Sequence, residues 1–202
     1  MFVLTVDQVG SRKRPDAVPQ LVSVSGEAVL PFDRTAGDEA QAVFDNAGAA
    51  IDCALSLASG GEWHCGLGQG RIEEPLPRSA REGRGTAYIN ARHAVDEAKK
   101  SGAHHFGFSS DSPLGAGIQA GLRTVIAVWG KRRDTTREAY EWALTGKTQA
   151  EIAAQLKISQ QAVSGRLAAG MYRELEDLKR EMTRWAEYLD APGRPGEKEW
   201  AS

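Results

Sequence analysis

Short apolar runs alternate with helical patterns over the first 108 residues. The run at residues 2–6 stops at Asp7 and Gly10, which is typical of a buried strand that enters a loop. Two more strands, at 28–35 and 40–44, flank the residues Ala-Gly-Asp-Glu and predict a hairpin with a tight turn. Further strands are expected at 63–68 and 104–108, and helices at 47–58 and at 86–100, the latter ended by Gly102.

This order of elements predicts an α+β protein with an α/β sandwich at residues 1–115. Helices are expected on one face of a mainly antiparallel sheet, with the first strand in its centre. Every later pattern is helical, so an all-α domain is expected over 116–190. The apolar helix from Ile118 fits either packing on the sheet or bridging the two parts. Residues 191–202, rich in Pro, Gly and charge, are expected to form a disordered tail.

A motif at residues 148–167 contains two helix start signals. Thr148 followed three residues later by Glu151 predicts a capping box, and Ser159 predicts the cap of a second helix. Between and after the caps, apolar residues at a spacing of four predict the buried faces of both helices. These residues are Ile152, Leu156, Val163 and Leu167.

The polar positions of the second helix suit contacts with double-stranded DNA, because amide, hydroxyl and guanidinium groups bind base edges and phosphates. The motif resembles the helix-turn-helix of bacterial transcription regulators and of the promoter-binding region of sigma factors, in the form T-x-x-E-I-A-x-x-L-x-I-S-x-x-A-V-S. The alternative is an amphipathic helical hairpin that binds nothing. The expected DNA-binding residues are Thr148, Ser159, Gln160, Gln161, Ser164, Arg166, Lys131, Arg132 and Arg133.

Charge and composition restrict the classes of partner. The 25 basic and 27 acidic residues give a net charge of −2, which excludes binding to nucleic acid through overall positive charge. Residues 121–180 nevertheless contain 11 basic and 7 acidic side chains, so a local basic surface is expected there. A signal-peptide pattern and an apolar run long enough to span a membrane are both absent from the sequence, and cysteines number 2. These features favour a cytoplasmic protein without membrane contact.

After the motif, apolar residues recur at alternating spacings of four and three from Met171 to Leu189. This pattern is typical of the seam of a coiled coil. A homodimer through the helix at 171–189 would present two recognition helices to two DNA half-sites. The same seam fits equally well a helix that packs back on its own domain, and both alternatives stay open.

Two carboxylates in the first part predict a candidate metal site. Asp7 ends the first strand and Asp38 lies in the hairpin turn, so a central first strand would bring them close together. Paired carboxylates at strand ends can bind Mg²⁺ or Mn²⁺. The alternative is that both are turn residues, where Asp is common because it hydrogen-bonds nearby backbone groups.

The Gly37-Asp38-Glu39 hairpin and the Gly66-Leu67-Gly68 strand resemble the palm-like, ferredoxin-like fold of class III nucleotide cyclases and diguanylate cyclases. The resemblance implies a nucleotide ligand, with Asn90 and Arg92 contacting ribose and phosphate. Ala36 departs from the diguanylate cyclase motif, as does Ala40. The spacing of two between Asn90 and Arg92 places them on opposite faces of a helix, so a surviving catalytic activity is not the favoured expectation.

Taken together, the opening Thr5-Val6-Asp7-Gln8-Val9-Gly10-Ser11-Arg12, the hairpin and the C-terminal motif resemble the SatD family over most of residues 1–170. The resemblance implies a bacterial DNA-binding or regulatory protein. We therefore expect a sequence-specific transcription regulator with a sensory or assembly domain at its N-terminus. The alternatives are a metal-dependent nucleotide-binding or cyclase-like protein, and a scaffold that recruits another protein through its C-terminal seam.

Overall fold

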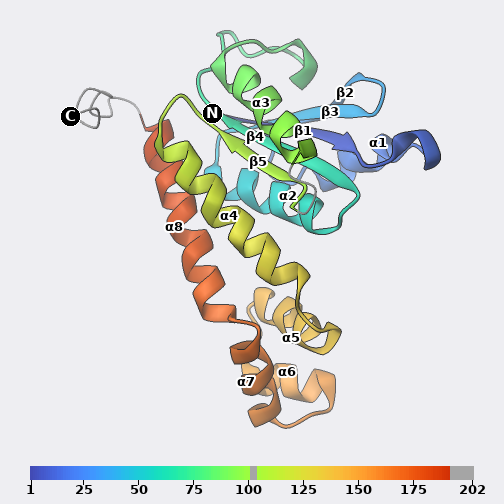
Figure 1. The fold of residues 1–202 in the computed structure, drawn as a ribbon, viewed down its shortest axis with the longest axis vertical. Coiled ribbons are helices and arrows are strands. Elements are labelled where there is room, and N and C mark those ends of the chain that lie inside the picture. Colours follow the sequence, from blue (N-terminus) through green and yellow to red (C-terminus); the bar gives the residue numbers. More distant parts are fainter. Residues whose placement is uncertain (101–103, 192–202) are drawn as a thin grey trace.

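The computed structural model describes residues 1–100 and 104–191, which form a mixed α+β protein (Figure 1). The expected end of a helix at Gly102 and nearly all of the expected tail at 191–202 lie outside these residues. The strands are β1 (Phe2–Gln8), β2 (Leu30–Ala36), β3 (Glu39–Phe44), β4 (Trp63–Gln69) and β5 (Phe106–Ser109). The α-helices are α1 (Val18–Leu21), α2 (Ala47–Ser59), α3 (Thr86–Lys100), α4 (Leu114–Gly130), α5 (Asp134–Leu144), α6 (Gln149–Leu156), α7 (Gln160–Ala169) and α8 (Tyr172–Asp190).

The five strands form one sheet in the order β2-β3-β1-β4-β5. The prediction of a central first strand in a mainly antiparallel sheet is confirmed, because β1 pairs antiparallel with both β3 and β4 and only the β4–β5 pair is parallel. The predicted hairpin is also present between β2 and β3. Its turn contains Gly37 at φ 59°, a left-handed conformation that glycine adopts without the steric cost of a Cβ atom.

Helices cover both faces of the sheet, so the prediction of helices on one face only was wrong (Figure 1). Leu4 of β1 belongs to the core that includes α2, whereas its neighbour Val3 packs with residues of α3 on the opposite face. Gly66 and Gly68 of β4 explain how α3 fits there. A Cβ atom on either glycine would lie 2.1 Å from a backbone nitrogen of α3, so only bare backbone lets the helix approach this closely.

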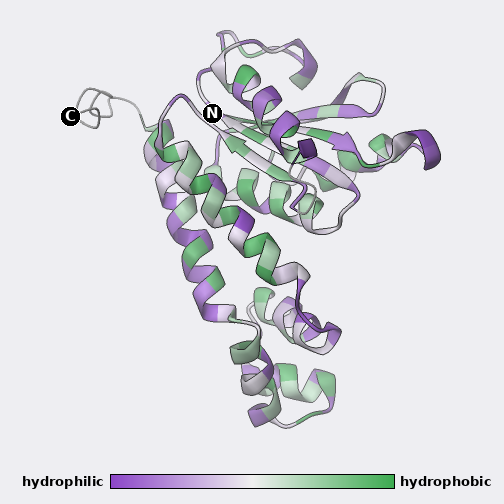
Figure 2. Ribbon diagram, viewed as in Figure 1, coloured by the Kyte–Doolittle hydropathy of each residue, from purple (hydrophilic) through white to green (hydrophobic). Residues whose placement is uncertain are grey.

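Helices α4 and α8 run side by side from the sheet towards the other end of the molecule (Figure 1). Both contribute to the core beneath the sheet, α4 through Ile118 and Leu122 and α8 through Met182 and Leu189. In Figure 2 hydrophobic colours dominate α4, whereas α8 alternates between hydrophobic and hydrophilic residues. The apolar seam of α8 packs on α4 and on the core beneath the sheet, beyond the helical domain of the second alternative, and the homodimer stays a prediction. Leu175, Met182 and Leu189 of the seam are buried, whereas Met171 and Trp185 remain 44% and 43% exposed.

The end of the molecule away from the sheet is formed by α5, α6 and α7 (Figure 1). These helices share a separate apolar core, because Ala139 and Ala143 of α5 pack with Ile152 of α6 and with Val163 and Leu167 of α7. The small alanine side chains on α5 allow the other two helices to pack closely against it. This core determines which face of α7 points outward.

Candidate functional site

The two predicted helix caps of the 148–167 motif are both present. The Thr148 hydroxyl accepts a hydrogen bond from the Glu151 backbone N–H at 3.3 Å, and the Thr148 N–H donates to the Glu151 carboxylate at 2.8 Å. This last bond, together with the Thr148 hydroxyl, holds the pKa of Glu151 below its usual value. The Ser159 hydroxyl accepts from the Ala162 N–H at 3.1 Å and caps α7. The caps hold both helix starts in place.

The turn between α6 and α7 contains Lys157 in the left-handed conformation, at φ 54°. It reverses the chain so that the apolar residues of both helices enter one core. On the outer side of α7, Gln160, Gln161 and Ser164 are exposed, and Gly165 has open space around it. These three polar side chains lie in the first half of α7 and project from one end of the molecule.

The four arginines and lysines expected to contact DNA fall into different environments. Lys131 and Arg133 are exposed, as a phosphate contact requires. Arg166 is only partly exposed, since it donates to the Thr135 carbonyl at 3.4 Å and lies 3.9 Å from a carboxylate of α5. Arg132 is buried, contrary to expectation. Its guanidinium lies 3.9 Å from the ring centre of Tyr140 and donates to a backbone carbonyl at the end of α7.

Arg132 therefore holds the helical end together from inside. Desolvation by burial lowers the pKa of its guanidinium, while hydrogen bonding to Tyr140 acts against this shift. The sequence pattern missed this role because Lys131-Arg132-Arg133 is a uniformly basic run. Only the positions of Tyr140 and Trp129, which face the same guanidinium, distinguish the middle residue from its neighbours.

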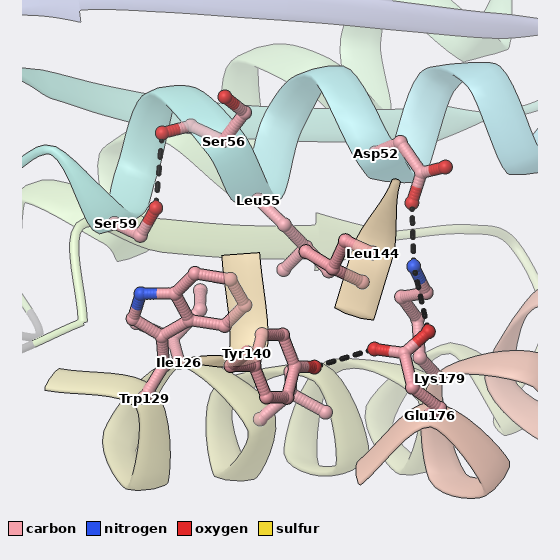
Figure 3. Close-up of a pocket in the computed structure, with 11 residues that line it drawn as sticks. Asp52, Leu55, Ser56, Ser59, Ile126, Trp129, Tyr140, Leu144, Glu176 and Lys179 are labelled. Carbon is pink, nitrogen blue, oxygen red and sulfur yellow. Dashed lines mark hydrogen bonds and ion pairs between the residues drawn. The ribbon is translucent and has the colours of Figure 1, made fainter. Parts of the chain in front are cut away.

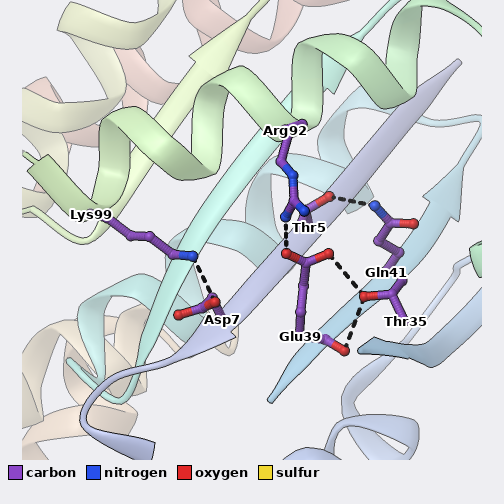
Figure 4. Close-up of polar contacts among 7 residues, drawn as sticks. All are labelled: Thr5, Asp7, Thr35, Glu39, Gln41, Arg92 and Lys99. Atoms are coloured by element: carbon purple, nitrogen blue, oxygen red, sulfur yellow. Dashed lines mark hydrogen bonds and ion pairs between the residues drawn. The ribbon is translucent and has the colours of Figure 1, made fainter. Parts of the chain in front are cut away.

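The candidate metal residues Asp7 and Asp38 line one cavity of about 480 Å³ at the C-terminal end of the central strand β1. The Gln8 N–H donates to the Asp38 carbonyl at 3.3 Å and keeps the hairpin turn beside the end of β1. Lys99 of α3 forms an ion pair with Asp7 at 2.7 Å (Figure 4). Arg12 also lines the cavity, with Lys13 next to it. The cavity lining thus contains three cationic side chains and the two carboxylates.

These surroundings do not suit a resident divalent cation. Mg²⁺ needs several oxygen ligands, whereas the Asp7 side chain is only 19% exposed and Lys99 occupies one of its two oxygens. The described residues also contain no group of three or more His, Cys, Asp and Glu side chains placed to hold a metal. With Lys99, Arg12 and Lys13 around it, the cavity suits an anion better than a bare metal ion.

The candidate nucleotide-binding residues Asn90 and Arg92 do not line this cavity. Asn90 is buried and donates hydrogen bonds to the Gln69 carbonyl and to Asp111. Arg92 forms an ion pair with Glu39 on the sheet (Figure 4). Together with the Lys99–Asp7 pair seven residues later on α3, this contact ties the helix to the sheet. Both residues therefore have structural partners, and they lie apart from each other as their spacing implied.

One pair of groups beside the cavity was given no role by the sequence analysis. The Nδ1 atoms of His64 and His105 lie 3.2 Å apart. Burial lowers the pKa of His64, and the neighbouring imidazole lowers it further. His64 lies on β4 and His105 directly precedes β5, so only the parallel pairing of these strands brings the two rings together.

Comparison with protein-family models, with curated proteins and with solved structures found no match for this chain. No helix among the residues described here combines the length and apolar content needed to cross a membrane.

Proposed function

We propose that this chain is a sequence-specific DNA-binding protein and a transcription regulator, in which α6 and α7 form a helix-turn-helix and α7 enters the major groove. One observation carries the proposal. The first half of α7 is capped and anchored by buried Val163, yet it presents exposed Gln160, Gln161 and Ser164 at an end of the molecule away from the sheet. An amide side chain at this place can make two hydrogen bonds to an adenine.

The charge of the helical end supports this proposal. Residues 131–170 contain seven basic and four acidic side chains, although the whole chain has a net charge of −2. Arg133 precedes α5, two residues before Thr135, whose carbonyl accepts a hydrogen bond from Arg166 of α7, and its side chain is exposed. Lys131 and Lys157 are exposed as well. Cations beside a recognition helix bind phosphates and set its position on the duplex.

The strand order in the first part of the chain supports a second element of the proposal, which is the family of the chain. The strand order β2-β3-β1-β4 agrees with a ferredoxin-like arrangement, to which β5 adds an edge strand. Together with the motif at 148–167, this order supports membership of the SatD family. The α/β part would then act as a sensory or assembly domain.

The first test is selection of bound fragments from a random pool of double-stranded DNA at physiological salt. Enrichment of a shared sequence is expected. The Gln161→Ala variant should weaken binding to that sequence by about 10-fold to 100-fold, because a bidentate contact to a base contributes roughly 1–3 kcal/mol. Gln20→Ala is the matched control, since Gln20 is an exposed helical glutamine on α1. Equal affinity of the two variants would remove α7 from the interface.

A second candidate function is binding of a phosphate-bearing small molecule, such as a nucleotide, in the cavity beside Asp7 and Asp38. The observation that favours it is the set of cations around this cavity, Arg12, Lys13 and Lys99. Calorimetry with ATP and GTP, with and without Mg²⁺, tests it. Lys99→Ala should weaken binding, whereas Lys100→Ala should not, because Lys100 pairs with Glu97 and does not line the cavity. Equal nucleotide affinity of the two variants would contradict binding in this cavity.

A further inference from the structure

A second cavity, of about 400 Å³, lies where the α/β part meets the helical end (Figure 3). Its walls come from four helices in three separate parts of the sequence, α2, the consecutive pair α4 and α5, and α8. The volume falls in the range of sites that enclose a small organic molecule. The lining side chains are Asp52, Leu55, Ser56, Ser59, Val125, Ile126, Trp129, Tyr140, Leu144, Glu176 and Lys179.

Most of the wall is apolar and part of it is aromatic. Leu55 of α2 faces the indole of Trp129 and the side chain of Leu144 across the cavity (Figure 3). The Trp129 and Tyr140 rings meet edge to face, with centres 4.5 Å apart, and so form a rigid corner. A flat ring of one or two cycles matches such a corner, because it covers apolar surface with little loss of conformational entropy.

A chain of polar groups runs along one side of the same cavity. The Lys179 ammonium lies 3.1 Å from the Asp52 carboxylate and 3.4 Å from that of Glu176, and the Tyr140 hydroxyl donates to Glu176 (Figure 3). The lining thus contains two carboxylates and one ammonium. Arg132 stacks against the Tyr140 ring outside the lining, and its positive charge also acts on Glu176.

Among these polar groups, Asp52 is the one that can accept further hydrogen bonds. Its side chain is 64% exposed, and Lys179 is bonded to only one of its two oxygens. Ser56, one helical turn further along α2, is exposed beside it. Asp52 faces one cation, whereas Glu176 faces two, so the free acceptors at Asp52 favour a ligand group that is positively charged and donates hydrogen bonds.

We propose that this cavity binds a small aromatic amine, with its ring between Leu55 and Trp129 and its ammonium on Asp52. The occupant would touch α2 on one side and α4 on the other, and it would also contact α5. Tyr140 and Leu144 line the cavity, while Ala139 and Ala143 of the same helix pack against α7 through the core of the helical end. Binding would therefore alter how firmly α7 is held relative to the sheet. This regulatory part rests on the proposed DNA binding, whereas the binding site itself does not.

Calorimetric titration of the full chain with tryptamine, indole and indole-3-acetate tests the site. Tryptamine should bind at least about fivefold more tightly than indole, a ratio expected for one partly exposed ion pair, and indole-3-acetate should bind most weakly. Preference for the acid, or equal binding of all three probes, would overturn the charge assignment. Absence of heat with every probe would overturn the site.

Variants locate the binding within the chain. Asp52→Asn keeps the shape of an exposed residue and should reduce tryptamine affinity to that of indole. Glu187→Gln is the control, because Glu187 is an exposed carboxylate of α8 outside the cavity. Equal loss in both variants would contradict the proposed position. Leu55→Trp should fill the cavity and abolish binding of tryptamine and indole, with circular dichroism to verify that the variant is folded.

The regulatory part is tested by measuring DNA affinity with and without saturating tryptamine. A change of at least about fivefold, the lower end of the usual range for linked sites, supports coupling between the cavity and α7. Unchanged DNA affinity in a chain that binds tryptamine would overturn the coupling. A chain that binds no DNA sequence would overturn the proposed function, while the calorimetric result would still decide the binding site.

Discussion

The surroundings of individual cations determine their roles at the helical end. Arg132 and Arg133 are neighbours in the sequence, yet only Arg132 is buried against Tyr140 and Trp129. Its guanidinium also donates to the carbonyl of Gly170 at the end of α7. Arg132 thereby links α4, α5 and α7, and Arg133 remains free to contact an anion.

We predict that Arg132→Ala lowers the free energy of unfolding by about 2–4 kcal/mol, because it removes two aromatic contacts and a buried hydrogen bond. Arg133→Ala should change it by less than about 0.5 kcal/mol. Urea unfolding curves measure both values. Similar losses of stability in the two variants would show that Arg132 is not an internal link. Arg133→Ala should instead weaken DNA binding and reduce its dependence on salt.

A second prediction at the residue scale concerns His64. Its pKa in the folded protein is lowered from the usual 6.5, first by burial and then by the charge of His105. At a pH between the folded and the unfolded pKa of His64, this residue binds more protons in the unfolded chain than in the folded one. The resulting contribution to stability is therefore complete above pH 6.5 and is lost as the pH falls through the folded pKa.

Urea unfolding at about pH 7.5 and about pH 5 tests this prediction. The His64→Gln variant should lose less stability on acidification than the original chain. His93→Gln is the control, since His93 is exposed on α3. A His64→Gln variant as sensitive to acid as the original chain would argue against a lowered pKa.

At the scale of elements, glycines have opposite effects depending on what packs against them. Gly68 lies beneath α3, where an added Cβ atom would meet the backbone of Ala91 at 2.1 Å. Gly165 lies on the exposed side of α7 with nothing within 4 Å. The first glycine permits the contact between a helix and the sheet, whereas the second only lowers the helix propensity of α7.

We predict that Gly68→Ala destabilises the protein by about 2 kcal/mol or more, because α3 must move away from the sheet. Gly165→Ala should stabilise it by up to about 1 kcal/mol. Thermal unfolding followed by circular dichroism measures the change in stability of both variants. A Gly68→Ala variant as stable as the original chain would mean that α3 does not lie as close to β4 as the structure shows.

At the scale of the whole molecule, the two ends of the described chain are held together. The Gln69 side chain at the end of β4 donates to the Leu189 carbonyl of α8 at 3.1 Å, and the Met1 amino group pairs with Asp190. Met182 and Leu189 of α8 are buried in the same core as the sheet. The α/β part therefore completes its core with helices that come last in the sequence.

We predict that residues 1–115 alone do not fold stably, because they lack the apolar residues that α4 and α8 add to this core. The isolated fragment should show poor dispersion of its amide signals in NMR spectra. The full chain should unfold in one transition, with the same midpoint for the sheet and for the helical end. A well-folded fragment, or two separate transitions, would contradict this view of the molecule.

Local sequence by itself determined most of the longer helices, the hairpin and both caps of the 148–167 motif, because these depend on residues a few positions apart. Only the tertiary structure decided that α3 covers the second face, that Arg132 is buried and that the apolar seam of α8 packs inward. The cavity next to Asp52 was equally hidden, since its walls come from four separate helices. The physical reason is the same in each case. Burial and charge environment depend on contacts between distant residues, and no local pattern records them.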